Sequence, residues 1–221
     1  DHVPLLVRGL RFILFIPRCS LVRPHLITYV FIPLFLLILE HAPKRVWMLV
    51  PLAVLWVNVH GLEYPVMYLI VGAYVLEDLV HRLRGAEAPR PWRLACAALI
   101  MGTVFLTPHG ARLPQLVFTP LTYAASVIQE YQPVKPVDFT WMKLVPTFQT
   151  AFNLIMYLAG FAGFVALLRR QLRLSHLVLL AGGILVATKG SRFMYEGALL
   201  ALPVLRATAP LWAMLPARAS P

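Results

Sequence analysis

Apolar stretches of 14 to 25 residues, separated by short polar breaks, follow one another along the whole chain. Sixty per cent of the 221 residues are hydrophobic and 13% are charged, whereas a soluble domain is about half apolar and about a quarter charged. The mean hydropathy is +0.75. Because one protein core cannot cover so much apolar surface, we expect the chain to need lipid as its solvent. The sequence therefore predicts an all-α transmembrane bundle that forms a single domain.

About eight membrane-crossing helices are expected from these stretches. We place them at residues 3–16, 26–41, 46–60, 62–80, 93–108, 144–168, 174–188 and 193–214. The first differs from the others because Arg8 and Arg11 lie inside it, and an arginine at the centre of a bilayer is costly. We expect this helix either to lie in the interface or to turn its arginines toward a polar groove.

Basic residues predict the orientation of the bundle. They gather in four groups: Lys44 and Arg45; Arg82, Arg84, Arg90 and Arg93; Arg169, Arg170 and Arg173; and Arg218. If the second group is cytoplasmic, alternation of the helices places all four groups on the same side, as the positive-inside rule expects. The net charge of +11 is then explained by topology and by contacts with phospholipid, and a nucleic-acid partner is not predicted.

The segment 109–143 is the one long stretch that is not expected to span. It holds four prolines, Pro114, Pro120, Pro133 and Pro136, so no long unbroken helix can cross it. We expect a re-entrant or interfacial helix over 113–128 and an extended arm over 129–141, both on the outer side.

Polar residues on the outer side are the candidates for function. Arg23 and His25 flank Pro24 at the start of a helix, where backbone N–H groups and a guanidinium can face a phosphate. The alternative is a simple anchor for lipid headgroups. Lys189 and Arg192 are basic where the charge rule does not place basic residues, which suggests an anionic ligand, with plain lipid anchoring as an equal alternative.

A second motif closes a helix with Trp-Val-Asn-Val-His-Gly at 56–61. Trp56 is typical of a membrane interface, and Asn58 and His60 would lie at the mouth of the bundle. The alternative is a helix C-cap in which Gly61 takes the left-handed conformation.

His109 and Glu130 complete the candidate set. His109 lies in a Pro-His-Gly break, and Glu130 is one of two acidic residues in the long outer segment. Glu130 could act as a base or bind sugar hydroxyls, or it could be a solvated loop charge.

Several chemistries are not indicated. The sequence has no Ser-His-Asp set, no Walker loop, no dinucleotide-binding glycine pattern and no metal-ligand spacing. His25, His60 and His109 are expected on separate elements, which is too weak a pattern to predict a metal, so no metal or cofactor is predicted. Cys19 and Cys96 lie far apart in sequence, and no disulfide is expected.

Five short motifs occur in a fixed order. They are Arg-Pro-His-Leu at 23–26, Trp-Val-Asn-Val-His-Gly at 56–61, Pro-His-Gly at 108–110, Glu-Tyr-Gln-Pro at 130–133 and Arg-Phe at 192–193. This series resembles bacterial polytopic membrane proteins related to GT-C-type glycosyltransferases, which use polyprenyl-phosphate-linked sugars on the outer face. Two departures are Thr107, where Asn is expected, and Tyr131, where Trp is more usual.

The resemblance implies a multi-pass protein of the bacterial inner membrane, with both ends of this chain cytoplasmic. It implies sugar transfer from a polyprenyl-phosphate carrier, with membrane lipids and other membrane proteins as partners. The resemblance implies that Arg23, Lys189 and Arg192 bind the phosphate. It implies that phosphate or sugar hydroxyls are bound by His25, Asn58, His60 and His109. Glu130 is a less favoured candidate for the base.

GT-C enzymes place their catalytic acid in the first outer loop, after the first spanning helix, and Asp1-His2 does not resemble that loop. We therefore expect this chain to be the downstream part of such a protein, with its catalytic residues unknown. Two other functions stay open at this point. One is a non-catalytic scaffold or accessory subunit, and the other is a transporter or flippase of an anionic lipid.

Overall fold

The computed structural model describes residues 25–85, 91–118, 148–190 and 193–207, and all the regular structure in them is helical. These residues fall into two compact units. The first unit holds the described residues from 25 to 118, and the second holds those from 148 to 207. The all-α class predicted from the sequence is confirmed for this part of the chain.

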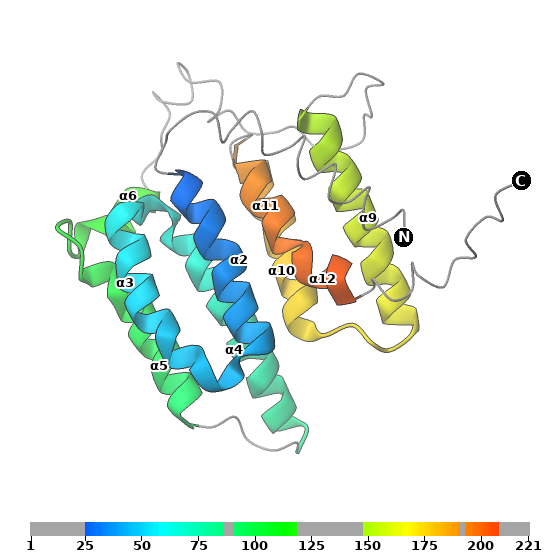
Figure 1. Ribbon diagram of the computed structural model, residues 1–221, viewed down its shortest axis with the longest axis horizontal. Coiled ribbons are helices and arrows are strands. Elements are labelled where there is room, and N and C mark those ends of the chain that lie inside the picture. The colour runs from blue at the N-terminus through cyan, green and yellow to red at the C-terminus, as the bar shows by residue number, and fades with distance from the viewer. Residues whose placement is uncertain (1–24, 86–90, 119–147, 191–192, 208–221) are drawn as a thin grey trace, which may run out of the picture. The chain divides into compact units, whose positions relative to one another are not determined.

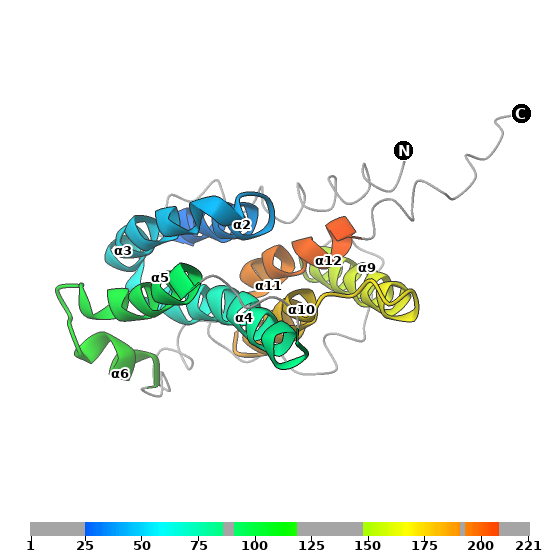
Figure 2. The ribbon, with the colours of Figure 1, turned by 90° about the horizontal axis from the view of Figure 1, so that it is seen from below.

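The first unit is built from up-and-down helices joined by short turns. Its elements are α2 (His25–His41), η1 (Pro43–Met48), α3 (Leu49–Val59), η2 (Gly61–Glu63), α4 (Tyr64–Leu83), α5 (Pro91–Gly102), η3 (Thr103–Phe105) and α6 (Arg112–Phe118), where η marks a 3-10 helix. Consecutive long helices run in opposite directions (Figure 1). Figure 2 shows α2 and α3 in one layer and α4 and α5 in the next.

Proline positions explain where several of these helices begin. Pro43 and Pro65 lie in the first turns of η1 and α4, and Pro91 is the first residue of α5. Proline is well suited to the first turn because its missing N–H has no partner there in any case. Pro33 is the exception, since it lies inside α2, where it removes one backbone hydrogen bond.

Trp56 forms the centre of the contact between α2 and α3. Its ring stacks on Phe31 with centroids 5.4 Å apart and meets Phe35 edge-on at 5.2 Å. The side chain is fully buried between the two helices, so its ring is not exposed to lipid headgroups, and its depth in a membrane stays a prediction. A large aromatic ring stabilises the fold more when it is buried between two helices than when it lies at a surface, because more of its apolar area is removed from water.

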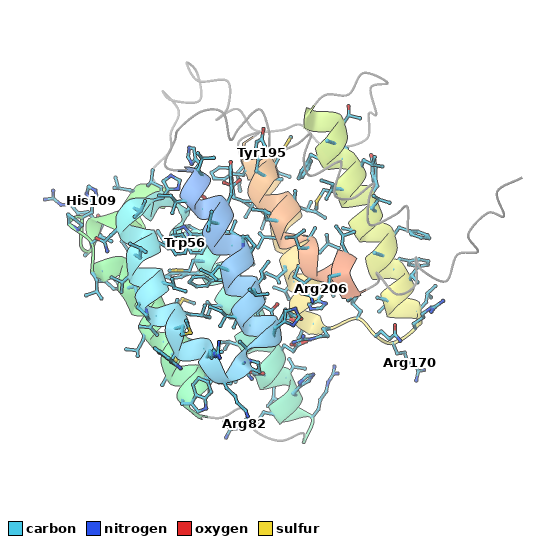
Figure 3. All side chains as sticks on the ribbon, viewed as in Figure 1. Trp56, Arg82, His109, Arg170, Tyr195 and Arg206 are labelled. Atoms are coloured by element: carbon cyan, nitrogen blue, oxygen red, sulfur yellow. The ribbon has the colours of Figure 1, made fainter. Side chains whose placement is uncertain are left out.

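The two ends of the first unit differ in charge. The turns that carry Lys44, Arg45, Arg82 and Arg84 lie at one end, where Arg93 Nη1 also pairs with Asp78 Oδ2 at 3.0 Å. The turns at 60–63 and 103–111 lie at the other end (Figure 3). The alternation predicted from the basic residues therefore holds within this unit.

The second unit contains α9 (Phe148–Leu168), α10 (Leu174–Thr188), α11 (Met194–Leu200) and α12 (Leu202–Ala207). The continuous helix expected from residue 193 onward is interrupted at Ala201. Pro203 explains the break, because it has no N–H to donate to the preceding turn.

Among the described residues, one helix is long and apolar enough to cross a membrane, over Thr150–Leu168. The apolar helices at His25–His41, Trp92–Phe105 and Leu174–Thr188 are shorter. At 1.5 Å per residue a helix of 17 residues is about 26 Å long, whereas the hydrocarbon core is about 30 Å thick. A bundle of eight spans therefore stays a proposal.

Some expectations lie outside the described residues. They are the helix at 3–16, most of the outer segment 109–143, and the side chains of Arg23, Glu130 and Arg192. The part of the outer segment that is described contains α6, which begins close to the start of the helix expected over 113–128.

Candidate functional site

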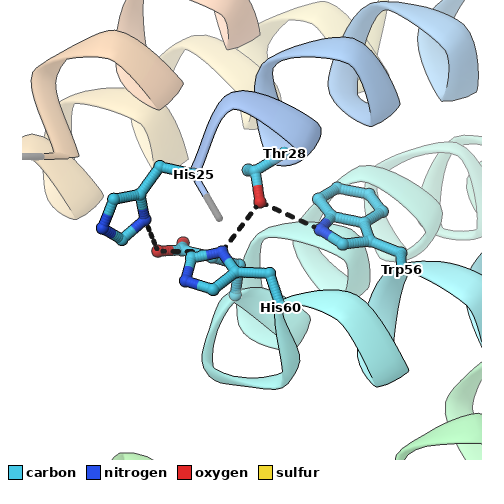
Figure 4. A network of polar contacts seen from close by, with 5 residues as sticks. His25, Thr28, Trp56 and His60 are labelled. Atoms are coloured by element: carbon cyan, nitrogen blue, oxygen red, sulfur yellow. Dashed lines mark hydrogen bonds and ion pairs between the residues drawn. The ribbon is translucent and has the colours of Figure 1, made fainter. Parts of the chain in front are cut away.

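Two histidines from separate motifs meet at one end of the first unit. His25 is the first residue of α2, and His60 is the C-cap of α3. Their rings are in edge-to-face contact, with centroids 4.5 Å apart and an interplanar angle of 79° (Figure 4). Both side chains are largely shielded, with exposures of 15% and 11%. The site is therefore a partly covered polar end of a helical bundle.

Glu63 lies against both histidines. It ends the short η2 turn, three residues after His60, and its side chain is only 1% exposed. Glu63 Oε1 is 3.8 Å from His25 Nδ1 and 3.9 Å from His60 Nδ1. These distances allow electrostatic attraction but exceed the length of an N–H···O hydrogen bond. A buried carboxylate is costly unless it is paired or hydrogen-bonded, and the two imidazole rings lie close enough to contribute to its stabilisation.

A buried hydroxyl connects this group to the core. Trp56 Nε1 donates to Thr28 Oγ1 at 3.1 Å, and the same oxygen lies 3.0 Å from His60 Nδ1 (Figure 4). An indole N–H can only donate, so Thr28 uses an acceptor lone pair on Trp56. The packing of Trp56 between α2 and α3 thus fixes the orientation of the His60 ring.

The arrangement does not have the geometry of a nucleophile–histidine–acid triad. In such a triad the hydroxyl and the carboxylate contact opposite nitrogens of one imidazole. Here the contacts of Thr28 and Glu63 to His60 are both made at Nδ1. Proton relay from Thr28 to Glu63 through the ring is therefore not supported by this geometry.

Asn58 and His109 lie outside this cluster. Asn58 Nδ2 donates to the carbonyl oxygens of Val54 at 2.8 Å and Leu106 at 3.2 Å, which ties α3 to the end of η3. His109 is exposed in the turn before α6 and is separated from Trp56 in Figure 3. Both residues lie at the same end of the unit as His25 and His60, and their substrate-binding roles stay predictions.

The remaining predicted residues belong to other parts of the chain. Lys189 is the exposed C-cap of α10, in the second unit. Arg23, Glu130 and Arg192 are outside the described residues. Their roles in holding a phosphate or serving as a base stay predictions.

Gly61 packs closely against a neighbouring helix and is not a left-handed cap. Among the described glycines the positive φ angles are at Gly85 and Gly110, and the α3 cap is His60 with φ of −143°. A Cβ atom on Gly61 would lie 3.1 Å from Leu113 Cδ2. The absence of a side chain lets α6 approach η2, so the proposed left-handed cap at Gly61 is wrong.

Glu63 and Thr28 are the site residues that the sequence analysis missed. Each lies three residues after a predicted histidine, as His60-x-x-Glu63 and His25-x-x-Thr28. This spacing places two side chains on the same face of a helical turn, which is the pattern that could have found them.

No protein-family model matches the chain, and no curated protein or solved structure is significantly similar to it. The resemblance to GT-C enzymes therefore rests on the short sequence motifs alone and stays a prediction.

Proposed function

We propose that this chain is part of a multi-pass bacterial inner-membrane protein of GT-C-like type, which transfers a sugar from a polyprenyl-phosphate carrier on the non-cytoplasmic face. The observation that carries the proposal is the meeting of His25 and His60 beside buried Glu63. Two motifs that the resemblance associates with phosphate or sugar binding thereby form one polar site, at the end of the unit opposite the basic turns.

The surfaces of the helices support a lipid environment. Large apolar side chains point outward along several helices, such as Val30 at 64% exposure, Leu99 at 60% and Leu168 at 67%. Extended apolar surface of this kind marks a contact with lipid or with another protein. Together with the apolar span in α9, it favours the membrane over water as the surroundings of these helices.

The charge distribution supports the proposed orientation. The turns with Lys44, Arg45, Arg82 and Arg84 would face the cytoplasm, following the positive-inside rule. In the second unit Arg169 and Arg170 follow α9, whereas Lys189 ends α10 at the opposite end of that helix pair. Both ends of the chain would then be cytoplasmic, and the histidine cluster would face outward.

In this function the leaving group is an anionic lipid phosphate, and the residues of the site would stabilise its charge. His25 and His60 would donate hydrogen bonds to phosphate or sugar oxygens. The positive charge that the sequence assigns to Arg23, Lys189 and Arg192 stays a prediction from the motifs alone. Donors fixed in advance around developing negative charge are among the largest contributions to catalysis. The base is left unassigned, with Glu130 as the one candidate from the sequence.

Because the catalytic residues are not assigned within this chain, the proposal is tested with the purified full-length protein in lipid nanodiscs that contain a panel of polyprenyl-phosphate sugars. Release of polyprenyl phosphate is followed by chromatography. His60→Ala should lower the rate about 100-fold or more, the scale on which a single oxyanion-stabilising donor acts. His41→Ala is the matched control, because His41 is exposed at the opposite end of α2, and its rate should equal that of the wild type.

Other outcomes identify the alternatives. Binding of polyprenyl phosphate without turnover of any donor would contradict transfer and indicate a non-catalytic lipid-binding subunit. Movement of a labelled anionic lipid between leaflets, with no sugar release, would indicate a flippase. Equal rates for wild type and His60→Ala would reject the role of the histidine cluster.

A further inference from the structure

We propose that His25, His60 and Glu63 form a binding site for a divalent transition-metal ion of the Zn²⁺ class. The site stands on its own geometry and does not depend on sugar transfer. Among the described residues, these three are the one group of metal-ligating side chains whose ligand atoms come together. The three atoms all lie within 4.8 Å of one another.

The spacing of these atoms is close to what a bound ion requires. A tetrahedral Zn²⁺ with bonds of about 2.1 Å holds its ligand atoms about 3.4 Å apart. With the three atoms within 4.8 Å, no pair would have to close by more than about 1.4 Å on binding, which small rotations of the imidazole and carboxylate groups provide. Glu63 Oε1 is also nearly equidistant from the Nδ1 atoms of the two histidines, at 3.8 and 3.9 Å, which shows that the carboxylate lies close to both rings.

The ligand types select the class of metal. Two imidazole nitrogens and one carboxylate oxygen suit zinc and related first-row ions. Calcium and magnesium prefer all-oxygen sites, so they are disfavoured here. Three protein ligands leave a coordination position for water or for an anionic oxygen, as in catalytic zinc sites, whereas structural sites use four protein ligands.

The hydrogen-bond partner of His60 is of the kind that a metal-binding histidine usually has. Thr28 Oγ1 has two lone pairs, so it can accept from Trp56 Nε1 and also from His60 Nδ1–H. In that tautomer the Nε2 atom of His60, on the side of the ring away from Thr28, would be the metal ligand. A histidine ligand usually donates its second ring N–H to a fixed acceptor in this way.

The fold also prepares the site before any ion binds. His60 and Glu63 are held in one short turn by the hydrogen bond from Glu63 N to the His60 carbonyl at 3.3 Å. His25 is brought to them by the packing of α2 on α3, which Trp56 and Thr28 hold in register. An ion held by these three ligands would add positive charge beside the buried Glu63 carboxylate, and its open coordination position, rather than the histidine N–H groups, would then contact an anionic oxygen.

The experiment uses the purified protein without a histidine tag, stripped with a chelator and then equilibrated with ZnCl₂. Bound metal is measured by plasma mass spectrometry after removal of free ions. We expect about one Zn²⁺ per chain, and near-complete loss in Glu63→Gln and in His60→Asn. His109→Asn is the matched control, since His109 is exposed outside the cluster, and it should retain the wild-type stoichiometry.

Co²⁺ replacement gives a second readout that loss of folding cannot imitate. The wild type should show visible absorption bands of low-coordinate Co²⁺, and Glu63→Gln, checked for native helicity by circular dichroism, should lose or shift them. The proposal is overturned if the wild type binds no more metal than His60→Asn, or if His109→Asn loses as much. Metal binding without sugar release would establish this site and reject the proposed transferase function. Sugar release without metal binding would reject the metal site and leave the transferase function in place.

Discussion

Thr28 shows how much of the site depends on one small side chain. Its buried hydroxyl contacts both Trp56 Nε1 and His60 Nδ1, and therefore joins the core of the α2–α3 contact to the histidine cluster. Because both contacts are made at one oxygen, removing it affects packing and function together.

Thr28→Val should lower the free energy of unfolding by about 1–3 kcal/mol, because it leaves the buried indole N–H of Trp56 without an acceptor. Valine has nearly the same shape, so packing itself is preserved. Unfolding of the purified protein with denaturant, followed by tryptophan fluorescence, measures the change. Thr188→Val, which removes an exposed hydroxyl bond to Leu185 in α10, should change the free energy by less than about 0.5 kcal/mol. Equal effects of the two substitutions would show that the Thr28 bond is unimportant.

The sequence predicted part of this cluster. His25 and His60 stand out because each lies beside a helix boundary in an apolar chain, where a polar residue has few structural reasons to occur. Glu63 does not stand out, because an acidic residue at the start of a helix is ordinary. The spacing His60-x-x-Glu63 indicates that these two side chains share a turn, but the contact with His25 depends on the packing of α2, which no local pattern in the sequence encodes.

At the scale of elements, α10 and α11 make the closest helix contact in the second unit. A Cβ atom on Gly197 would lie 2.7 Å from the Gly183 carbonyl oxygen, and one on Gly183 would lie 3.0 Å from the Gly197 carbonyl oxygen. The two backbones touch without intervening side chains. Small residues allow this approach between helices, and membrane proteins use it often.

Gly197→Ala should therefore destabilise the protein by about 1–3 kcal/mol, since the added methyl meets backbone that cannot move aside without separating the helices. Gly160→Ala is a control of opposite sign. Gly160 lies in α9 with no atom within 4 Å of an added Cβ, so alanine should stabilise the helix by up to about 1 kcal/mol. Thermal unfolding followed by circular dichroism measures both. A stabilising Gly197→Ala would contradict the close backbone contact.

The bounds of the helices were predicted best where the apolar pattern alone determines where a helix begins and ends. The expected helix at 174–188 has the same bounds as α10, and the expected helix at 26–41 begins one residue after α2. The last helix was predicted as continuous because its residues are apolar throughout, whereas the missing N–H of Pro203 interrupts it. The burial of Trp56 was not predicted, because the preference of tryptophan for membrane interfaces does not reveal a partner helix.

At the scale of the whole molecule, the orientation can be tested with two single cysteines. Leu83 and Leu106 are exposed leucines at opposite ends of the first unit. In a background without Cys19 and Cys96, a membrane-impermeant maleimide should label Leu106→Cys in intact spheroplasts. Leu83→Cys should be labelled only after the membrane is permeabilised, because it adjoins the basic turn.

Labelling of both cysteines in intact spheroplasts, or of neither, would contradict the proposed topology. Reversed labelling would keep the membrane bundle but place the histidine cluster in the cytoplasm, which would exclude donors presented on the outer face. The labelling of the two sites therefore tests the membrane location and the side of the cluster separately from any enzymatic assay.

The six-residue η1 turn between α2 and α3 has a consequence for how the protein is made. α3 has 11 residues, about half of what a spanning helix needs, so it has little means of entering a bilayer by itself. Joined so closely to α2 and bonded to it through Thr28 and Trp56, it would leave the translocon together with α2 as a preformed hairpin. The polar groups that later build the site would then be paired with each other before either helix meets lipid.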